Sequence, residues 1–152
     1  MRLHIKIKTE KSTIPFDHQA LLTGCIHKWL GWNNEHGEIS LYSFSRLEGA
    51  KAVKAGLKFE NDSSFFFSSH NDELIKKMIS GIQSSPKMFN RLEVFEIIIQ
   101  QNPDLSDRTL FYVASPVFIK RQFKGNVEHI LYTDSRANSF LKETMETKMQ
   151  IA

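Results

Sequence analysis

The order of hydrophobic periods along residues 2–100 constrains the fold of this chain more than any other feature. Strand-like alternation and helix-like spacing of apolar side chains succeed one another in six segments. The segments are residues 2–8, 18–30, 40–47, a strand ending at Phe65-Phe66-Phe67, a helix from Asn71 or Asp72 to Ile82, and residues 91–100. Their order is strand, helix, strand, strand, helix, strand. This order predicts a ferredoxin-like α+β domain with two helices on one face of a four-stranded sheet.

Capping and turn residues delimit these segments. Asp17 is the expected N-cap of the first helix, and Asn71 or Asp72 that of the second. The run EGAKAVKAG at residues 48–56 lacks a clear period, so we expect a loose connection there. The pattern therefore places the helix starts more firmly than the connection between the two middle strands.

After residue 105 the pattern begins again. Residues 109–122 are expected to form one or two strands bent at Ser115-Pro116, residues 129–132 a short strand, and residues 135–149 a helix. We therefore divide the chain into a ferredoxin-like domain at residues 1–105 and an incomplete second ferredoxin-like unit at residues 106–152.

The composition is that of a globular protein, with 41% hydrophobic and 24% charged residues. The net charge of +3 is unevenly distributed: residues 1–60 and residues 108–152 each carry +3, and residues 61–107 carry −3. If the two basic ends share a face, they form a patch for phosphates; the alternative is scattered surface charge. We find no signal peptide and no membrane-spanning run, so we expect a cytoplasmic protein without a membrane partner.

The single cysteine, Cys25, excludes a disulfide framework and any multi-cysteine zinc site. It lies within the apolar side of the first helix, where a buried, unreactive thiol is expected. The six histidines show no H-x-x-x-H or H-x-H spacing. We therefore expect neither a metal site nor a cofactor.

His27 is the first candidate for chemistry. Its helical azimuth lies about 150° from the centre of the apolar stripe, so it should point away from the packed side of the helix. Its neighbour Lys28 could hold a phosphate. An imidazole can accept or donate a proton near neutral pH. A surface histidine without a role is the alternative.

His36 lies beside Glu35 and Gly37 in the loop before the second strand. Two histidines suit RNA transesterification: one accepts the proton of the ribose 2′-hydroxyl, the other protonates the leaving oxygen, and a cation stabilises the phosphorane. No metal is required. The alternative for His36 is an ordinary polar loop residue.

Several segments together resemble a known family. They are RLHIKIK, PFDHQALLTGCIH, LYSFSRL, FFFSSHNDELIKKMISGI, ASPVFIKR and SFLKETMETKM. In this order and spacing they resemble the CRISPR repeat-processing endoribonucleases of the RAMP superfamily. The resemblance covers essentially the whole chain. It implies two ferredoxin-like units in tandem and metal-independent cleavage of CRISPR precursor transcripts, which leaves a 2′,3′-cyclic phosphate and a 5′-hydroxyl and yields guide RNAs for antiviral defence.

The chain departs from the family pattern at two places. Alignment on Gly37 puts Asn34 where members often carry a catalytic histidine, so that role falls to His36 through a loop shift or to His27. The resemblance favours His27, because some members carry a tyrosine or histidine there. The chain also ends at Ala152 before the glycine-rich loop of the family, from which we expect a truncated form of a longer protein.

The expected RNA contacts are basic side chains in the two positively charged parts of the sequence: Arg46, Lys51, Lys54, Lys120, Arg121 and Lys124. Arginine suits phosphate best because its planar fork donates two hydrogen bonds. The expected partner is CRISPR precursor RNA, with other CRISPR effector subunits and a second copy of the chain as further candidates. Two alternative functions stay open: a non-catalytic RNA-binding RAMP subunit of an effector complex, and a ferredoxin-like interaction domain without an RNA role.

Overall fold

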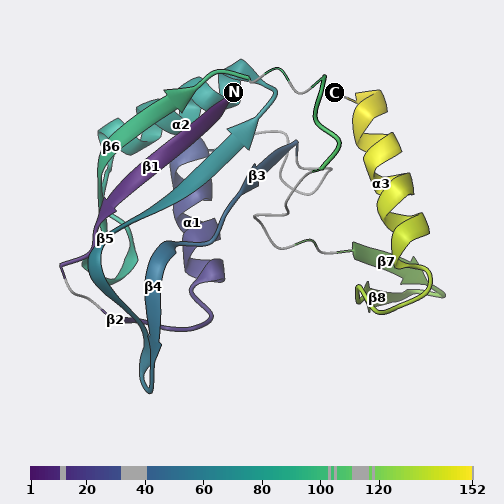
Figure 1. The fold of residues 1–152 in the computed structure, drawn as a ribbon, viewed down its shortest axis with the longest axis horizontal. Coiled ribbons are helices and arrows are strands. Elements are labelled where there is room, and N and C mark those ends of the chain that lie inside the picture. The colour runs from purple at the N-terminus through teal and green to yellow at the C-terminus, as the bar shows by residue number, and fades with distance from the viewer. Residues whose placement is uncertain are drawn as a thin grey trace. The chain divides into compact units, whose positions relative to one another are not determined.

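The computed structural model describes residues 1–10, 13–31, 41–102, 104, 106–110, 117 and 119–151. The chain forms two compact units, Met1–Phe111 and Tyr112–Ala152, and each is described here by itself. The first unit contains one β-sheet and two α-helices, and the second unit contains a β-hairpin and one α-helix (Figure 1).

A single antiparallel sheet forms the base of the first unit (Figure 1). Its long strand β5 pairs with β1 on one side and with β3 and β4 on the other, while β1 also pairs with β6. The strands are β1 (Arg2–Lys8), β2 (Thr13–Ile14, paired with the start of β5), β3 (Tyr42–Phe44), β4 (Glu48–Val53), β5 (Gly56–Ser69) and β6 (Glu93–Gln100). The resulting order, β6-β1-β5-β4, confirms the predicted ferredoxin-like fold.

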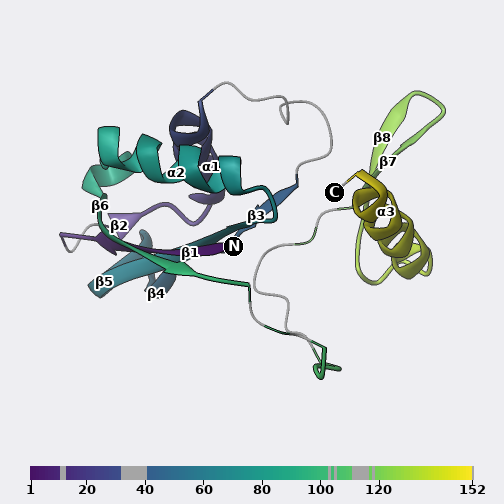
Figure 2. The same ribbon diagram turned by 90° about the horizontal axis from the view of Figure 1, so that it is seen from above.

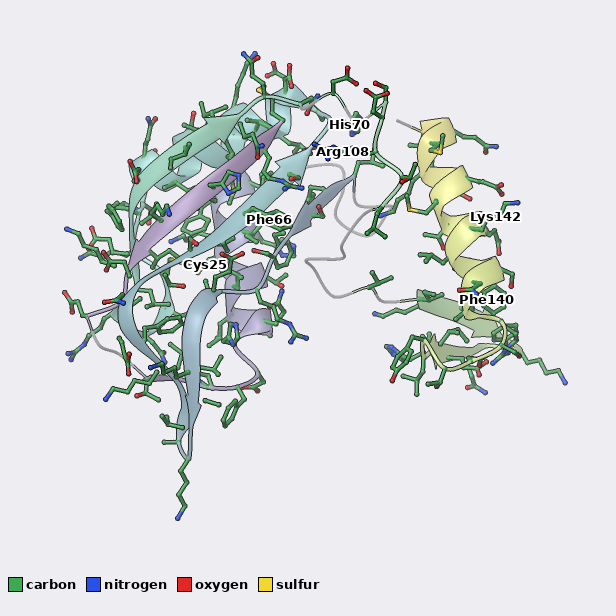
Figure 3. The ribbon with its side chains drawn as sticks, in the orientation of Figure 1. Cys25, Phe66, His70, Arg108, Phe140 and Lys142 are labelled. Carbon is green, nitrogen blue, oxygen red and sulfur yellow. The ribbon has the colours of Figure 1, made fainter. Side chains whose placement is uncertain are left out.

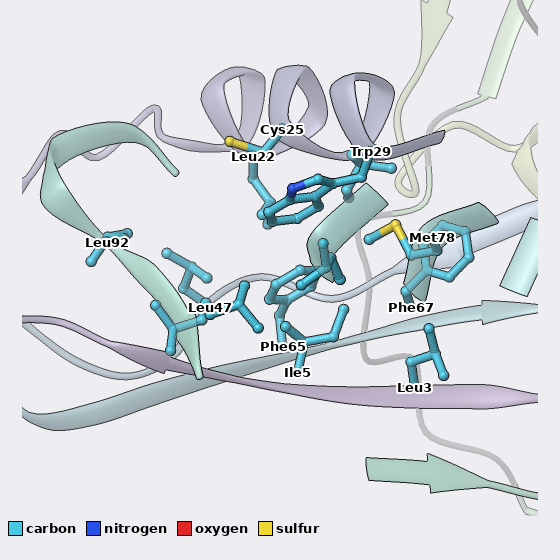
Figure 4. Packing of buried hydrophobic residues seen from close by; sticks show 14 of the residues in the cluster. Leu3, Ile5, Leu22, Cys25, Trp29, Leu47, Phe65, Phe67, Met78 and Leu92 are labelled. Atoms are coloured by element: carbon cyan, nitrogen blue, oxygen red, sulfur yellow. The ribbon is translucent and has the colours of Figure 1, made fainter. Parts of the chain in front are cut away.

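Helices α1 (Gln19–Leu30) and α2 (Asp72–Ser84) cover one face of this sheet (Figure 2). Side chains alternate between the two faces of a strand, so Leu3, Ile5 and Ile7 of β1 point toward the helices and are fully buried. Phe65 and Phe67 of β5 lie in the same layer, beneath Trp29 of α1 and Met78 of α2 (Figure 4). The core therefore lies between the sheet and the helix pair, and the other face of β1, β5 and β6 is mostly polar, with Phe66 and Ile98 as apolar exceptions.

The connection between the middle strands differs from the prediction. Residues 48–56, expected to be a loose connection, contain β4 and the turn into β5. Gly49 has φ +80°, and the register shifts between Glu48 and Ala50. A bulge of this kind bends the strand and hides its period from the sequence. Of the expected strand at residues 40–47, only Tyr42–Phe44 form β3; residues 45–47 connect it to β4, and Ser40 lies outside the described residues.

The helix starts were predicted with mixed success. The N-cap position of α1 is His18, whose side chain makes no capping hydrogen bond, so the assignment to Asp17 was wrong. His18 is instead buried by packing. At α2 the prediction of Asn71 is confirmed, because its Oδ1 accepts a hydrogen bond of 2.9 Å from the Glu73 amide.

Replacing Asn71 with alanine is expected to lower the free energy of unfolding by about 1 kcal/mol, since the first turn of α2 loses its side-chain acceptor. Asn71→Ser is the matched control, because serine also caps helices well, and it should retain most of the stability. Urea denaturation followed by circular dichroism measures both variants. Equal loss in Asn71→Ala and Asn71→Ser would contradict a capping role.

The second unit consists of β7 (Ile119–Phe123), β8 (Asn126–Ile130) and α3 (Ala137–Ile151). Lys124 and Gly125, both with positive φ, form the two-residue turn of the hairpin, as a type I′ turn requires. Ile119, Ile130 and Ala137 form its small core.

The helix matches the expected residues 135–149 to within two residues, and β8 begins three residues before the expected strand at 129–132. The expected strand segment at 109–122 is confirmed only from Ile119 onward, because Thr109, Leu110 and Val117 are not in a strand. The bend at Ser115-Pro116 lies outside the described residues. The interpretation of the second unit as an incomplete ferredoxin-like unit stays a prediction.

Candidate functional site

His27 lies near the C-terminal end of α1 and is half-buried. It lies outside the set of buried residues that face the core, as its azimuth predicted, but it is not directed into open solvent. Its Nε2 atom is 3.2 Å from the hydroxyl oxygen of Tyr42 on β3. The His27 carbonyl accepts a hydrogen bond from the Gly31 amide, and Gly31 ends the helix with φ +62°. The imidazole is thus held at the junction of α1 and β3.

Tyr42 was not among the predicted site residues. Its ring stacks on Phe67 at 5.3 Å and on Phe44 at 6.5 Å between ring centroids, and these contacts fix the hydroxyl next to the imidazole. A hydroxyl that hydrogen-bonds a histidine orients the ring and favours one of its tautomers. A hint of this role was present in the sequence. The alternation of residues 41–47 places Tyr42 on the same strand face as Phe44, so the Tyr42 hydroxyl is a polar group beside an apolar ring.

Lys28 points away from this pair. Its ammonium donates hydrogen bonds to the Lys87 carbonyl at 2.6 Å and to Ser85, and it lies 5.2 Å from the centroid of the Trp29 ring. The Trp29 indole donates a further bond of 2.8 Å to the Ser85 carbonyl. Lys28 and Trp29 therefore tie the end of α1 to the segment after α2. The structure does not bring the Lys28 ammonium together with the His27–Tyr42 pair.

His36, Asn34 and Glu35 lie outside the described residues, so their placement relative to His27 is not tested. The described chain resumes at Leu41 and enters β3 at Tyr42. The described residues on either side of this segment are Gly31, which follows the helix of His27, and Leu41, which precedes the strand of Tyr42. The role of His36 stays a prediction.

The predicted RNA-binding residues fall in both units of the chain. In the first, Arg46 and Lys54 are exposed, and Lys51 forms an exposed ion pair of 2.9 Å with Glu60. In the second, Lys120 and Lys124 are exposed.

Arg121, in the second unit, is engaged within its own fold. Its guanidinium donates to the Phe140 carbonyl at 2.9 Å and to Thr144, pairs with Glu143 at 3.2 Å, and lies over the Phe140 ring. Phe140 lies in the first part of α3 (Figure 3). These contacts join β7 to α3. Of the predicted contacts, Arg46 and Lys54 are thus exposed without an ion pair among the described residues of the first unit, and Arg121 serves packing in this structure.

Cys25 is buried, as expected, and burial raises the pKa of its thiol above the ordinary value. The thiol is therefore protonated at neutral pH and unsuited to act as a nucleophile. Within the described part of the chain, no group of three or more His, Cys, Asp or Glu side chains is placed to hold a metal ion. Nor is any helix of these residues long and apolar enough to cross a membrane.

Three solved structures with this architecture are described as Cas6, Cas6-related and RAMP proteins. A "CRISPR associated protein Cas6" superposes with a TM-score of 0.80 at 20% identity, over 99% of this chain and 70% of that one. A Cas6-related protein from Pyrococcus furiosus gives 0.79 at 23% identity, over 97% and 69% of the two chains. The fold is that of the Cas6 and RAMP proteins.

A third structure, described as an RAMP protein that binds different RNA substrates, superposes with a TM-score of 0.78 at 20% identity, over 97% of this chain and 70% of that one. No protein-family model matches the sequence, and no curated protein matches it significantly. The resemblance inferred from the order of motifs is thus confirmed by the Cas6 and RAMP fold, and the catalytic and RNA-binding residues are not tested by these comparisons.

Proposed function

We propose that this chain is a metal-independent endoribonuclease that cleaves CRISPR precursor transcripts within the repeat and leaves a 2′,3′-cyclic phosphate and a 5′-hydroxyl. The observation that carries the proposal is the His27–Tyr42 contact, an imidazole held by a phenol at the end of α1, in a fold shared with Cas6 proteins. CRISPR precursor RNA is the proposed substrate, and other effector subunits or a second copy of the chain are proposed partners.

His27 has the chemistry that RNA transesterification needs. An imidazole can accept the proton of the 2′-hydroxyl or deliver a proton to the leaving 5′-oxygen. The Tyr42 hydroxyl orients the ring and is a second group able to move a proton or to hydrogen-bond the phosphate. His36 is proposed as the complementary acid or base. The reaction breaks the P–O5′ bond as the P–O2′ bond forms, so the proton balance needs one base and one acid and no metal ion.

A non-catalytic RNA-binding RAMP subunit is the second candidate function. It is favoured by Asn34, which stands where the family often carries a histidine, and by the likeness to an RAMP protein that binds RNA. In this reading the His27–Tyr42 pair contacts RNA without moving protons.

Incubation of the chain with an end-labelled transcript of the source organism's CRISPR repeat, in excess EDTA, tests the proposal. The expected result is one cut within the repeat, with a 5′ product whose cyclic phosphate is opened by acid treatment. Retention of the uncut transcript in a mobility-shift assay would support the binding subunit instead. Absence of both cleavage and binding would leave an interaction domain without an RNA role.

A further inference from the structure

Strand β6 forms one edge of the sheet in the first unit (Figure 1). Other described residues cover the start of this edge, where the Val94 amide donates to the Pro86 carbonyl at 3.0 Å on the side away from β1. Beyond Val94, none of the described strands pairs with β6 on this side. The open part, residues 97–99, consists of three isoleucines, and Ile98 and Ile99 are 45% and 55% exposed.

This open edge lacks the usual protection against pairing. Natural sheets protect their edges with lysine, proline, bulges or very short strands, because unpaired N–H and C=O groups invite another strand. Strand β6 has a bulge at Phe95 and carboxylates at Glu93 and Glu96, but all of these lie before the isoleucines. Residues 97–99 therefore have the character of a pairing surface.

The register of β6 shows which of its backbone groups can pair. Val94, Ile97 and Ile99 lie opposite the three buried residues of β1, so their side chains point to the helix side of the sheet. Residues of one strand that share a face also direct their backbone groups to the same side of the strand. Since the Val94 amide points away from β1, the N–H and C=O groups of Ile97 and Ile99 do so too. An added antiparallel strand can bind all of these groups.

A groove of about 430 Å³ follows this edge on the helix side of the sheet. It lies between α2 and β6, and its walls include Ile79 and Ile82 of α2 and Ile97 and Ile99 of β6. An added strand would direct every second side chain to this side of the sheet, where those side chains would extend the core between sheet and helices. The strand that fits is therefore one with apolar residues at alternate positions.

We propose that β6 of a second copy of the chain occupies this edge, with a twofold axis at Ile98. In this antiparallel register Ile98 faces Ile98 of the second copy on the helix-free side. On the helix side, Ile97 of each copy faces Ile99 of the other, and these are the hydrogen-bonded pairs. The isoleucines of each copy thus fill the groove of the other. A twofold contact uses the same surface on both copies, so the assembly closes as a dimer.

Charge complementarity favours a copy of β6 in this register. Glu96 lies two residues before Ile98 and Gln100 two residues after it, so each carboxylate faces the amide of a Gln100. The Gln100 Oε1 lies 2.8 Å from the His4 Nε2, which leaves the amide nitrogen as a donor to the carboxylate. A register shifted by two residues toward the start of β6 would place Glu96 against Ile98, and a shift of four would place two Glu96 side chains against each other, which is unfavourable.

Sedimentation equilibrium of the full chain over a wide range of concentration tests the dimer. The parent chain is expected to approach twice the 17.6 kDa of one chain. Ile98→Lys and Ile98→Glu should each weaken self-association roughly 10-fold or more, because like charges then face each other at the axis. An equimolar mixture of these two variants should form dimers again, since opposite charges then meet. Val53→Lys places the same charge on β4, at the other edge of the sheet, and should leave self-association unchanged.

A parent chain that stays monomeric, an assembly of more than two copies, equal weakening by Val53→Lys, or a mixture that does not recover would each overturn the proposal. An edge that binds a different protein instead would leave the parent chain monomeric. Ile98→Thr keeps a β-branched side chain and should weaken self-association several-fold with an unchanged circular dichroism spectrum, so a folding defect in the charged variants cannot hide the result.

The dimer deepens the proposed function, on which it rests only for a second copy as a partner, by naming the surface that this copy binds. Its readout is the mass of the assembly, so it is tested apart from cleavage. Dimers without repeat cleavage would sink the nuclease and leave the dimer; cleavage by a chain that stays monomeric would do the reverse.

Discussion

Substitution of His27 by alanine should slow cleavage of the CRISPR repeat transcript roughly 100-fold or more, because general acid–base catalysis by one side chain contributes a factor of this size. Neither neighbour of His27 on α1 can replace the imidazole: Lys28 is bonded to Ser85 and Lys87, and Cys25 is a buried, protonated thiol. Single-turnover cleavage with enzyme in excess measures the rate of the chemical step without product release.

Three variants make this measurement specific. His70→Ala removes an exposed histidine that directly precedes the N-cap residue of α2, and it should leave the cleavage rate unchanged. Tyr42→Phe removes the hydroxyl and keeps the stacked ring, so a smaller loss, roughly 10-fold, is expected if the phenol orients the imidazole. His36→Ala should cost as much as His27→Ala if the two share the proton transfers. Unchanged rates in both histidine variants, with normal circular dichroism, would refute this assignment.

The largest loss of stability is expected from Gly81→Ala. Gly81 lies in α2 where that helix crosses α1, and a Cβ atom built there would meet the backbone of Trp29, with the Trp29 Cα at 2.6 Å and its carbonyl oxygen closer still. Backbone atoms cannot rotate out of the way, so the two helices must separate. Overpacking of this kind costs about 1–3 kcal/mol or more and outweighs the gain of about 1 kcal/mol in helix propensity. We expect a net loss of about 2 kcal/mol in urea denaturation.

Gly24→Ala is the matched control. Gly24 lies in the middle of α1, is exposed, and none of the described residues comes within 4 Å of a Cβ built there. Alanine should therefore stabilise the chain by up to about 1 kcal/mol through helix propensity alone. A shift of the urea midpoint in the same direction for both variants would contradict a close approach of α1 and α2 at Gly81.

These two glycines illustrate what a sequence can and cannot say. In the sequence, Gly24 interrupts a strong helical pattern, which is typical of a glycine where another backbone approaches closely. The structure places that approach at Gly81 instead. Both are mid-helix glycines in the sequence, and the crossing point of two helices depends on how each packs on the sheet, which no local pattern encodes.

The ferredoxin-like fold and the residues that face the core could be predicted from the sequence, because hydrophobic periods record which side of each element is buried. Strand β4 could not, because its bulge hides the period. The sequence also singled out His27 and Asn71. Only the tertiary structure joined His27 to Tyr42, turned Lys28 toward Ser85, and set Arg2 over Phe66. Those contacts link residues between 15 and 64 positions apart, and their partners are chosen by strand register and helix packing, which are properties of the whole sheet.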